Sequence, residues 1–385
     1  METMHPVVLH GCSTWDKELL PLDEFTIRLQ KIQNDLQEKN LKGAIIYSDV
    51  RNYAKVCYFS NYIPKHSYAI LLIPAIGEPR LLAKLAGIRD IPYVQTLTWI
   101  EDIRAVKNLE NEIREFLEQI ATSDAQENSK PTVGICGNEL MTNKVYKDII
   151  SAGEFVNFEE IDSHLDSTLR QKRPREKAVI NEAVSLLQHS VVAMKEVHRR
   201  EGSVVTAMVE AEQVARNYGA QDVRILFSLD YGKTLQPLET ISEVRNDPMI
   251  AYIAIDYLGY WVEGMVTLIQ QPNEIYDQTI TLLNNLKKSL VSGASISSII
   301  KDSTKSIAPY ELHPVSLGGY GYNIGLSLKE KPLLHENYGN DVIQEGDIYS
   351  LHACLTNGKE EHCLLSSIIS INKNGNEILW SSLKN

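Results

Sequence analysis

The chain has 385 residues, of which 43% are hydrophobic and 23% are charged, and its formal net charge is −12. This length exceeds one ordinary core, so we expect two domains in a soluble globular protein. The acidic balance argues against nucleic-acid binding, which needs a basic surface. No apolar run reaches the roughly 18 residues of a membrane span, and the first residues lack the basic start and apolar core of a secretory signal.

Cysteine usage predicts a reducing compartment, and we therefore expect a cytoplasmic protein. The cysteines are odd in number and widely separated, which does not indicate a disulfide framework. They are Cys12, Cys57, Cys136, Cys354 and Cys363.

The first part of the chain, residues 1–165, is predicted to form an α/β domain. Apolar residues recur at helical spacing, whereas other short apolar runs are typical of buried strands. Helices are expected over 23–39 and 107–121, and strands over 41–48, 67–74 and 131–137. Strands that alternate with helices favour this fold class.

The second part, residues 166–385, is predicted to be an α+β domain, and a basic, proline-broken linker at 170–175 marks its start. A long amphipathic helix begins at Glu176, and antiparallel strands follow further helices. The other helices are expected over 203–218 and 274–292, and the strands over 223–229, 249–255, 259–269, 348–355 and 364–372.

A glycine-rich segment at 316–334, SLGGYGYNIGLSLKEKPLL, is the most specific motif of the chain. It resembles the HGIGL-x-x-HE-x-P segment of the creatinase, prolidase and aminopeptidase P family, the pita-bread enzymes. The resemblance extends over about residues 23–380. It implies a creatinase-like N-terminal domain and a pita-bread, metallopeptidase-like C-terminal domain. The two histidines of the family's segment, which face a two-metal active site, fall here on Tyr322 and Lys329.

The resemblance also implies where the other metal ligands of the family would lie. The family uses two Asp, one His and two Glu. The matching positions in this chain are Tyr252, Glu263, Tyr322, His352 and Ser366. A histidine on the substrate side is expected near Gly232 and would fall at 236–238, where there is none. A shifted register could bring Asp256 into the site; otherwise Asp256 is a turn residue at the end of a strand.

One carboxylate at these positions cannot neutralise two adjacent dications, which normally bind several hard oxygen ligands. We therefore expect no metal at the site, and we expect no other cofactor. Some pita-bread enzymes, such as creatinase, cleave C–N bonds without metal, so loss of the ligands does not by itself exclude catalysis.

Three functions follow as alternatives. The first is a metal-independent hydrolase of a small amide, guanidino or imino compound or a short peptide. His352 would act as general acid or base, oriented by Glu263, while Tyr322 and Lys329 donate to a developing oxyanion. Tyr252 and Ser366 would contact the substrate. The second is a non-catalytic binding or partner protein on the same scaffold. The third is a conventional metal-dependent Xaa-Pro aminopeptidase whose ligands are misaligned here.

A zinc site is a rival interpretation of the C-terminal strands. Asn357-Gly358 favours a two-residue hairpin turn. That turn would place four possible ligands on one face: His352, Cys354, Glu361 and Cys363. Alternatively, both cysteines are buried and inert, and the register of the resembled family, with 352 opposite 366, requires a longer loop.

The resemblance implies a homodimer in which the N-terminal domain of one subunit helps to close the active site of the other. Residues 58–62 and 64–66 are the candidate segments for that contact. Nucleic-acid and membrane partners are not expected.

Overall fold

The computed structural model describes residues 15–65, 67–85, 87–121, 130–237, 248–358 and 361–383. Cys12, His66 and Leu238, which the sequence interpretation covers, lie outside these ranges. The chain divides into two compact units, Met1–Leu169 and Arg170–Asn385.

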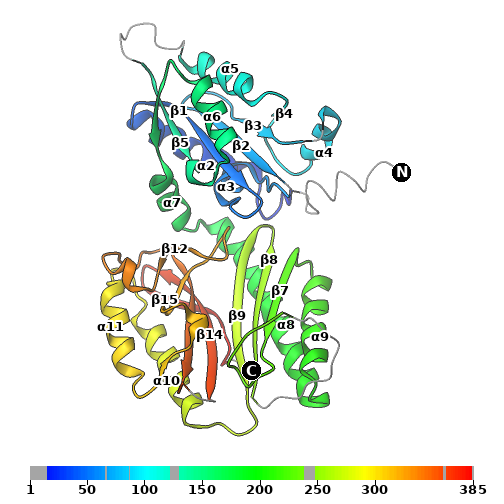
Figure 1. Cartoon of the computed structure of the whole chain (residues 1–385), viewed down its shortest axis with the longest axis vertical. Coiled ribbons are helices and arrows are strands. Elements are labelled where there is room, and N and C mark those ends of the chain that lie inside the picture. Colours follow the sequence, from blue (N-terminus) through cyan, green and yellow to red (C-terminus); the bar gives the residue numbers. More distant parts are fainter. Residues whose placement is uncertain are drawn as a thin grey trace. The chain divides into compact units, whose positions relative to one another are not determined.

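Unit 1 is built on a mixed sheet of six strands in the order β4-β3-β2-β1-β5-β6 (Figure 1). The strand bounds are β1 Leu41–Asp49, β2 Tyr68–Pro74, β3 Arg80–Ala83, β4 Asp102–Ala105, β5 Thr132–Cys136 and β6 Asn157–Glu160. β1 pairs antiparallel with β2 and parallel with β5. It is buried on both faces, which explains its continuous apolar sequence.

Helices pack on this sheet through the apolar faces that their sequences predict. The α-helices of unit 1 are α2 Leu22–Glu38, α3 Ala54–Ser60, α4 Ile91–Val94, α5 Leu109–Ala121, α6 Asn143–Ala152 and α7 Asp162–Arg170. α2 buries Phe25, Ile32 and Leu36, at helical spacing. Helices α5 and α6 pack into a cluster with inward residues of β1 and β2. The α/β character predicted for this part of the chain is confirmed.

The segment proposed to contact a partner subunit is largely internal to unit 1. Tyr58 and Tyr62 are both 2% exposed, and Phe59 is 1% exposed. The Arg28 guanidinium lies 4.3 Å from the Tyr58 ring centre. These aromatic side chains pack inside their own domain. The arrangement therefore does not favour a role for them in closing the active site of a partner subunit.

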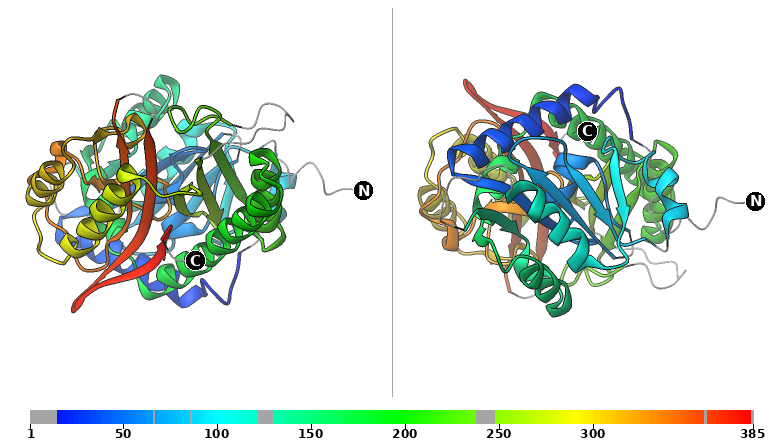
Figure 2. Two further views of the ribbon diagram at one scale, coloured as in Figure 1. Left: turned by 90° about the horizontal axis from the view of Figure 1, so that it is seen from below. Right: turned by 90° about the horizontal axis from the view of Figure 1, so that it is seen from above.

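Unit 2 begins with two long helices and a small antiparallel sheet. α8 Pro174–Glu201 packs beside α9 Val204–Asn217, as Figure 1 and the left view of Figure 2 show. The sheet contains β7 Asp222–Phe227, β8 Met249–Tyr257 and β9 Tyr260–Leu268 in that order.

A second sheet follows helices α10 Glu274–Ser289 and α11 Ile296–Ser306. Its order is β12-β11-β13-β14-β15, with β10 beside β13. The bounds are β10 Glu311–Leu312, β11 Gly321–Asn323, β12 Glu330–Leu333, β13 Ile348–Thr356, β14 His362–Asn372 and β15 Gly375–Ser381. The two sheets meet through side chains: Thr267 on β9 donates to the Leu364 carbonyl on β14 and accepts from the Leu364 N–H.

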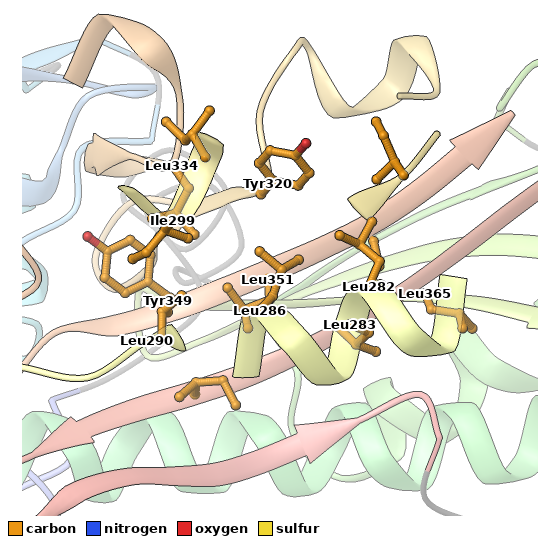
Figure 3. Close-up of a cluster of buried hydrophobic side chains, with 14 of the residues drawn as sticks. Leu282, Leu283, Leu286, Leu290, Ile299, Tyr320, Leu334, Tyr349, Leu351 and Leu365 are labelled. Atoms are coloured by element: carbon orange, nitrogen blue, oxygen red, sulfur yellow. The ribbon is translucent and has the colours of Figure 1, made fainter. Parts of the chain in front are cut away.

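The core of unit 2 lies between α10 and the second sheet. Figure 3 shows Leu282, Leu283 and Leu286 of α10 near Leu351 of β13 and Leu365 of β14. Spacings of three and four residues place the α10 leucines on one face, where they lose their contact with water. The predicted helix is therefore confirmed, although it ends at Ser289, before the expected 292.

The glycine-rich motif has a structural role in this unit. A Cβ at Gly325 would lie 2.6 Å from Lys172 Cε and 2.6 Å from Glu330 Oε1. Those two side chains form an ion pair at 2.5 Å that ties the linker to β12. Nearby, the Arg170 guanidinium donates twice to Asp347, at 2.8 and 2.7 Å. The linker is thus fastened to unit 2 by two buried ion pairs.

The predicted zinc hairpin is wrong. β13 and β14 pair with His352 opposite Ser366 and Cys354 opposite Leu364. The turn closes from Asn357 to Glu361 by a backbone hydrogen bond, so it is longer than the two-residue turn. This register puts Cys363 opposite Leu355, on the other face from Cys354. The four proposed ligands therefore do not converge.

Leu286→Ala tests the packing of the core of unit 2. Leu286 is completely buried, and its truncation should lower the free energy of unfolding by about 2–5 kcal/mol because it leaves a cavity. The measurement is urea unfolding of both proteins. Asn285→Ala, at the exposed neighbouring position, should change stability by less than about 0.5 kcal/mol. Equal effects of the two substitutions would contradict this packing.

Candidate functional site

The hairpin of β8 and β9 fixes the first two residues of the site. Its turn is formed by Leu258 and Gly259, whose φ values are +51° and +84°. Asp256 Oδ1 accepts a hydrogen bond from the Gly259 N–H at 2.7 Å. Asp256 therefore belongs to the turn, and the register shift that would bring it into the site is not observed. In the resulting register Glu263 lies opposite Ala254, diagonal to Tyr252 on the same face.

Glu263, on β9, is the centre of a hydrogen-bond network that joins four strands. His352 Nε2 on β13 lies 2.6 Å from Glu263 Oε1. The hydroxyls of Tyr252 on β8 and Tyr322 on β11 donate to Glu263 Oε2 at 2.6 and 2.8 Å. Because an ionised carboxylate only accepts hydrogen bonds, His352 Nε2 is the donor. Three donors thus fill three of the roughly four acceptor positions of this carboxylate.

The carboxylate and the imidazole at the centre of the network are buried, whereas Tyr252 and Tyr322 are half-buried. Glu263 is 1% exposed and His352 is 2% exposed. Burial raises the pKa of Glu263, but the charge and hydrogen bond of His352 and the two phenol hydrogen bonds outweigh it, so the pKa lies below its ordinary value. Glu263 is therefore ionised at neutral pH.

Both phenols of the network are held neutral. Burial raises the pKa of Tyr252 well above its ordinary value, and the Glu263 charge raises it further. The same two causes raise the pKa of Tyr322. The Tyr322 ring also contacts the His352 ring edge to face, with ring centres 4.9 Å apart. These tyrosines act as hydrogen-bond donors to Glu263.

Lys329 and Ser366 contact groups other than the Glu263 carboxylate. Lys329 Nζ lies over the Tyr322 ring, 5.5 Å from its centre, and its side chain is exposed. Ser366 is opposite His352, but its Oγ accepts the Met265 N–H at 2.7 Å. Ser366 therefore links the two sheets through its Oγ.

Ser350 is a member of the site that sequence reasoning missed. Its Oγ lies 3.2 Å from His352 Nε2, and the residue is completely buried. The signal was available, because residues two apart on a strand share a face. Ser350 precedes His352 by two positions on β13.

The chemistry of these donors does not fit a pair of divalent metals. Within the ranges that the structure describes, no three His, Cys, Asp or Glu side chains are grouped so that they could hold a metal ion. The site offers one carboxylate and one imidazole, which already contact each other, and the neighbouring tyrosines are neutral. Such a set leaves the +4 charge of two metals largely uncompensated.

Comparisons with known proteins agree with the architecture. The chain has the pita-bread fold. It resembles the prolidase of Pyrococcus horikoshii with a TM-score of 0.71 and 16% identity, over 93% of this chain and 99% of that one. It resembles the Xaa-Pro dipeptidase of Bacillus anthracis with a TM-score of 0.71 and 16% identity, over 94% and 98%. It also resembles an Escherichia coli aminopeptidase P variant with a TM-score of 0.71 and 14% identity, over 95% of each chain.

The sequence itself places the first unit in a family. Residues 28–168 match the creatinase/prolidase N-terminal domain. This match confirms the predicted creatinase-like N-terminal domain, and the solved structures confirm the predicted pita-bread fold. A comparison with curated proteins found no match. None of the helices in the described ranges is long and apolar enough to cross a membrane.

Glu263→Gln tests the network through its dependence on pH. The variant should lose about 3 kcal/mol at pH 7, because it weakens a buried, charge-assisted network. The folded-state pKa of Glu263 lies below its ordinary value of 4.5. The contribution of ionised Glu263 to the free energy of unfolding is therefore complete above about pH 4.5. It is lost as the pH falls through the folded-state pKa.

The measurement is the free energy of unfolding between neutral and acidic pH. The wild-type curve should fall more steeply in acid than the curve of Glu263→Gln. Glu345→Gln, at an exposed position, should follow the wild type. Parallel curves for wild type and Glu263→Gln would show that Glu263 is not held as an ion by this network.

Proposed function

We propose that this chain is a non-catalytic binding or partner protein on the pita-bread scaffold, which does not use a metal pair. The observation that carries the proposal is that internal donors occupy three of the roughly four acceptor positions of Glu263. The one carboxylate at the inherited ligand positions is buried and accepts hydrogen bonds from His352, Tyr252 and Tyr322. A substrate or metal would have to displace internal donors that already satisfy it.

The orientation of the donors supports this proposal. Catalytic donors in a hydrolase point to the position where negative charge develops on the substrate. Here the hydroxyls of Tyr252 and Tyr322 point to Glu263 instead. Their raised pKa values keep both protons in place. The site is thus organised to stabilise a negative charge of the protein, which holds β8, β9, β11 and β13 together.

A metal-independent hydrolase is the second candidate, and the short contact between Glu263 and His352 favours it. A carboxylate that accepts from one ring nitrogen of a histidine orients the ring for proton transfer. In this scheme His352 exchanges the proton with a small amide, guanidino or imino compound, and Glu263 stabilises the imidazolium. The 2% exposure of His352 means that the site must open first.

The metal content distinguishes these candidates from a conventional Xaa-Pro aminopeptidase. Protein purified from a medium with manganese and cobalt should contain no stoichiometric metal, and EDTA should leave its stability unchanged. We expect no hydrolysis of Xaa-Pro dipeptides, since no metal-bound water forms. The measurements are elemental analysis and amino-acid release, with an active prolidase assayed in parallel. Two bound transition metals per chain would overturn the proposal.

A substrate screen separates the two metal-independent candidates in the same assay. Turnover of any small amide, guanidino or imino compound that is abolished in His352→Gln, but retained in the control variant His335→Gln at a half-buried position, would establish the hydrolase. His335 lies outside the network, and its Nδ1 only accepts the Asn337 N–H. We expect no turnover by the wild-type protein or by either variant.

We further propose that the chain is a cytoplasmic homodimer, on the basis of its relationship to the pita-bread family. Sedimentation velocity at micromolar concentration should give the mass of two chains, about twice 43.4 kDa. The expected partner is a second copy. A single species with the mass of one chain would contradict the dimer.

A further inference from the structure

Two buried histidines lie together in unit 2 and are separate from the side chains that donate to Glu263. His313 and His362 are 3% and 8% exposed, and their rings are perpendicular, with ring centres 5.3 Å apart. His362 is the first residue of β14, whereas His313 precedes the short helix Pro314–Ser316. The pair is a buried titratable cluster that the proposed function leaves unused.

His313 joins two segments that are far apart in the sequence. Its Nδ1 accepts the Val315 N–H at 3.2 Å, so Nδ1 carries no proton. Its Nε2 therefore carries the proton of the neutral ring and donates to the Gly232 carbonyl at 2.9 Å. Gly232 belongs to residues 228–236, here called the 228–236 turn. Because a protonated imidazole only donates, protonation of His313 would abolish its contact with the Val315 N–H.

His362 packs directly against the same turn. A Cβ at Gly232 would lie only 2.9 Å from His362 Cβ. Both ring nitrogens of His362 are buried and have no hydrogen-bond partner within the described part of the chain. A protonated ring in this place would bury two N–H donors and a positive charge without an acceptor, which is costly. Water can hydrate that charge only when the turn moves away.

The surroundings keep both rings neutral at pH 7. Burial lowers the pKa of His313, although the contact with the Gly232 carbonyl and the charge of Asp230 oppose this shift. Burial and the neighbouring His313 lower the pKa of His362; Lys233 acts in the same direction, and Asp230 opposes it. Burial is the largest cause for both histidines, so the pKa of each lies below its ordinary value of 6.5.

Exposed carboxylates also lie on the strands beside His362. Glu311 and His362 are each opposite Thr356, on its two sides. Glu361 precedes His362, and its Oε2 accepts a hydrogen bond from the Asn357 side chain at 2.6 Å. Both carboxylates are in contact with water, so they are screened and do not compensate a charge on the buried ring.

The two segments that His313 joins cover one apolar cluster. Leu235 of the 228–236 turn and Val315 are half-buried, and both pack against this cluster. Tyr252 packs against it as well, so the cluster adjoins the Glu263 network. The members of the cluster are Ile250, Met265, Cys354 and Leu364. Movement of the turn would therefore expose buried apolar side chains to water.

We propose that His313 and His362 form an acid-sensitive latch on unit 2. While both rings are neutral, they hold the 228–236 turn and Val315 over the apolar cluster. Their protonation releases the turn and exposes the cluster. The latch does not depend on whether unit 2 serves as a binding protein or as a hydrolase.

The direction of the pH dependence follows from the lowered pKa values. The closed turn binds fewer protons than the open turn, in which water hydrates both rings. The closed turn is therefore most stable above about pH 6.5, and it loses stability as the pH falls below that value. This loss ends when both rings are protonated in the closed turn as well. It begins well above about pH 4.5, where Glu263 starts to lose its contribution, so the two effects can be separated.

Hydrogen exchange of the full chain at pH 7 and pH 5 measures the opening. The Gln236 N–H, which donates to the Phe227 carbonyl, should exchange at least about tenfold faster at pH 5 after correction for the intrinsic effect of pH on exchange. The Val315 amide should respond in the same way. The amide of Ile253, in β8 and completely buried, should keep its protection at both pH values.

Variants assign the response to the histidine pair. His362→Phe keeps an aromatic ring without a titratable group, so it should retain the protection at pH 7 and reduce the response to acid. Combination with His313→Asn, which keeps a side chain suited to the N-cap, should abolish the response. His335→Asn is the matched control, because His335 Nδ1 accepts the Asn337 N–H in the same manner. That variant should respond as the wild type does.

The corrected ratio of exchange rates at the two pH values decides the proposal. Equal corrected rates in the wild type would overturn it. So would a full response to acid in the double variant, with the Ile253 amide still protected to show that the protein is folded. Loss of the response in His335→Asn would also contradict a latch formed by His313 and His362.

Discussion

A buried carboxylate that is satisfied by the protein itself is the constraint on which the C-terminal unit depends. Glu263 is withdrawn from water at a desolvation cost, and that cost is offset only while His352, Tyr252 and Tyr322 all donate to it. These donors come from β13, β8 and β11, so one charge fixes the relative positions of strands from two sheets. Removal of any donor would leave an acceptor position of the buried Glu263 carboxylate without a hydrogen bond.

The pita-bread scaffold of this chain is held together by side chains both at and outside the positions that match the family's metal ligands. Residues of the glycine-rich motif and of the linker perform structural tasks outside the ligand positions. Gly325 leaves space for the Lys172–Glu330 ion pair, and Asp347 accepts both hydrogen bonds of Arg170. The ligand positions, in contrast, carry tyrosine, histidine and serine. A two-metal site holds its strands together by shared ligation, whereas here hydrogen bonds to one carboxylate provide that connection.

Much of the fold could be predicted because its signals are local. The alternation of helices and strands, the α10 leucines and the Gly259 turn all act through neighbouring residues, and that turn correctly placed Tyr252 near Glu263. The zinc hairpin was wrong because a favourable Asn-Gly pair was outweighed by the tertiary register of β13 and β14. The contacts of Ser366 and Lys329 could not be predicted, because they depend on which strand lies alongside and on side-chain direction.

The central claim is that Glu263 is an ion satisfied by internal donors and is not a metal ligand. Anomalous X-ray diffraction from crystals soaked in manganese tests it most directly. The account predicts no anomalous peak within about 3 Å of Glu263, with the contacts to His352, Tyr252 and Tyr322 preserved. A manganese ion bound by Glu263 and His352, with the two tyrosine hydroxyls displaced, would contradict it.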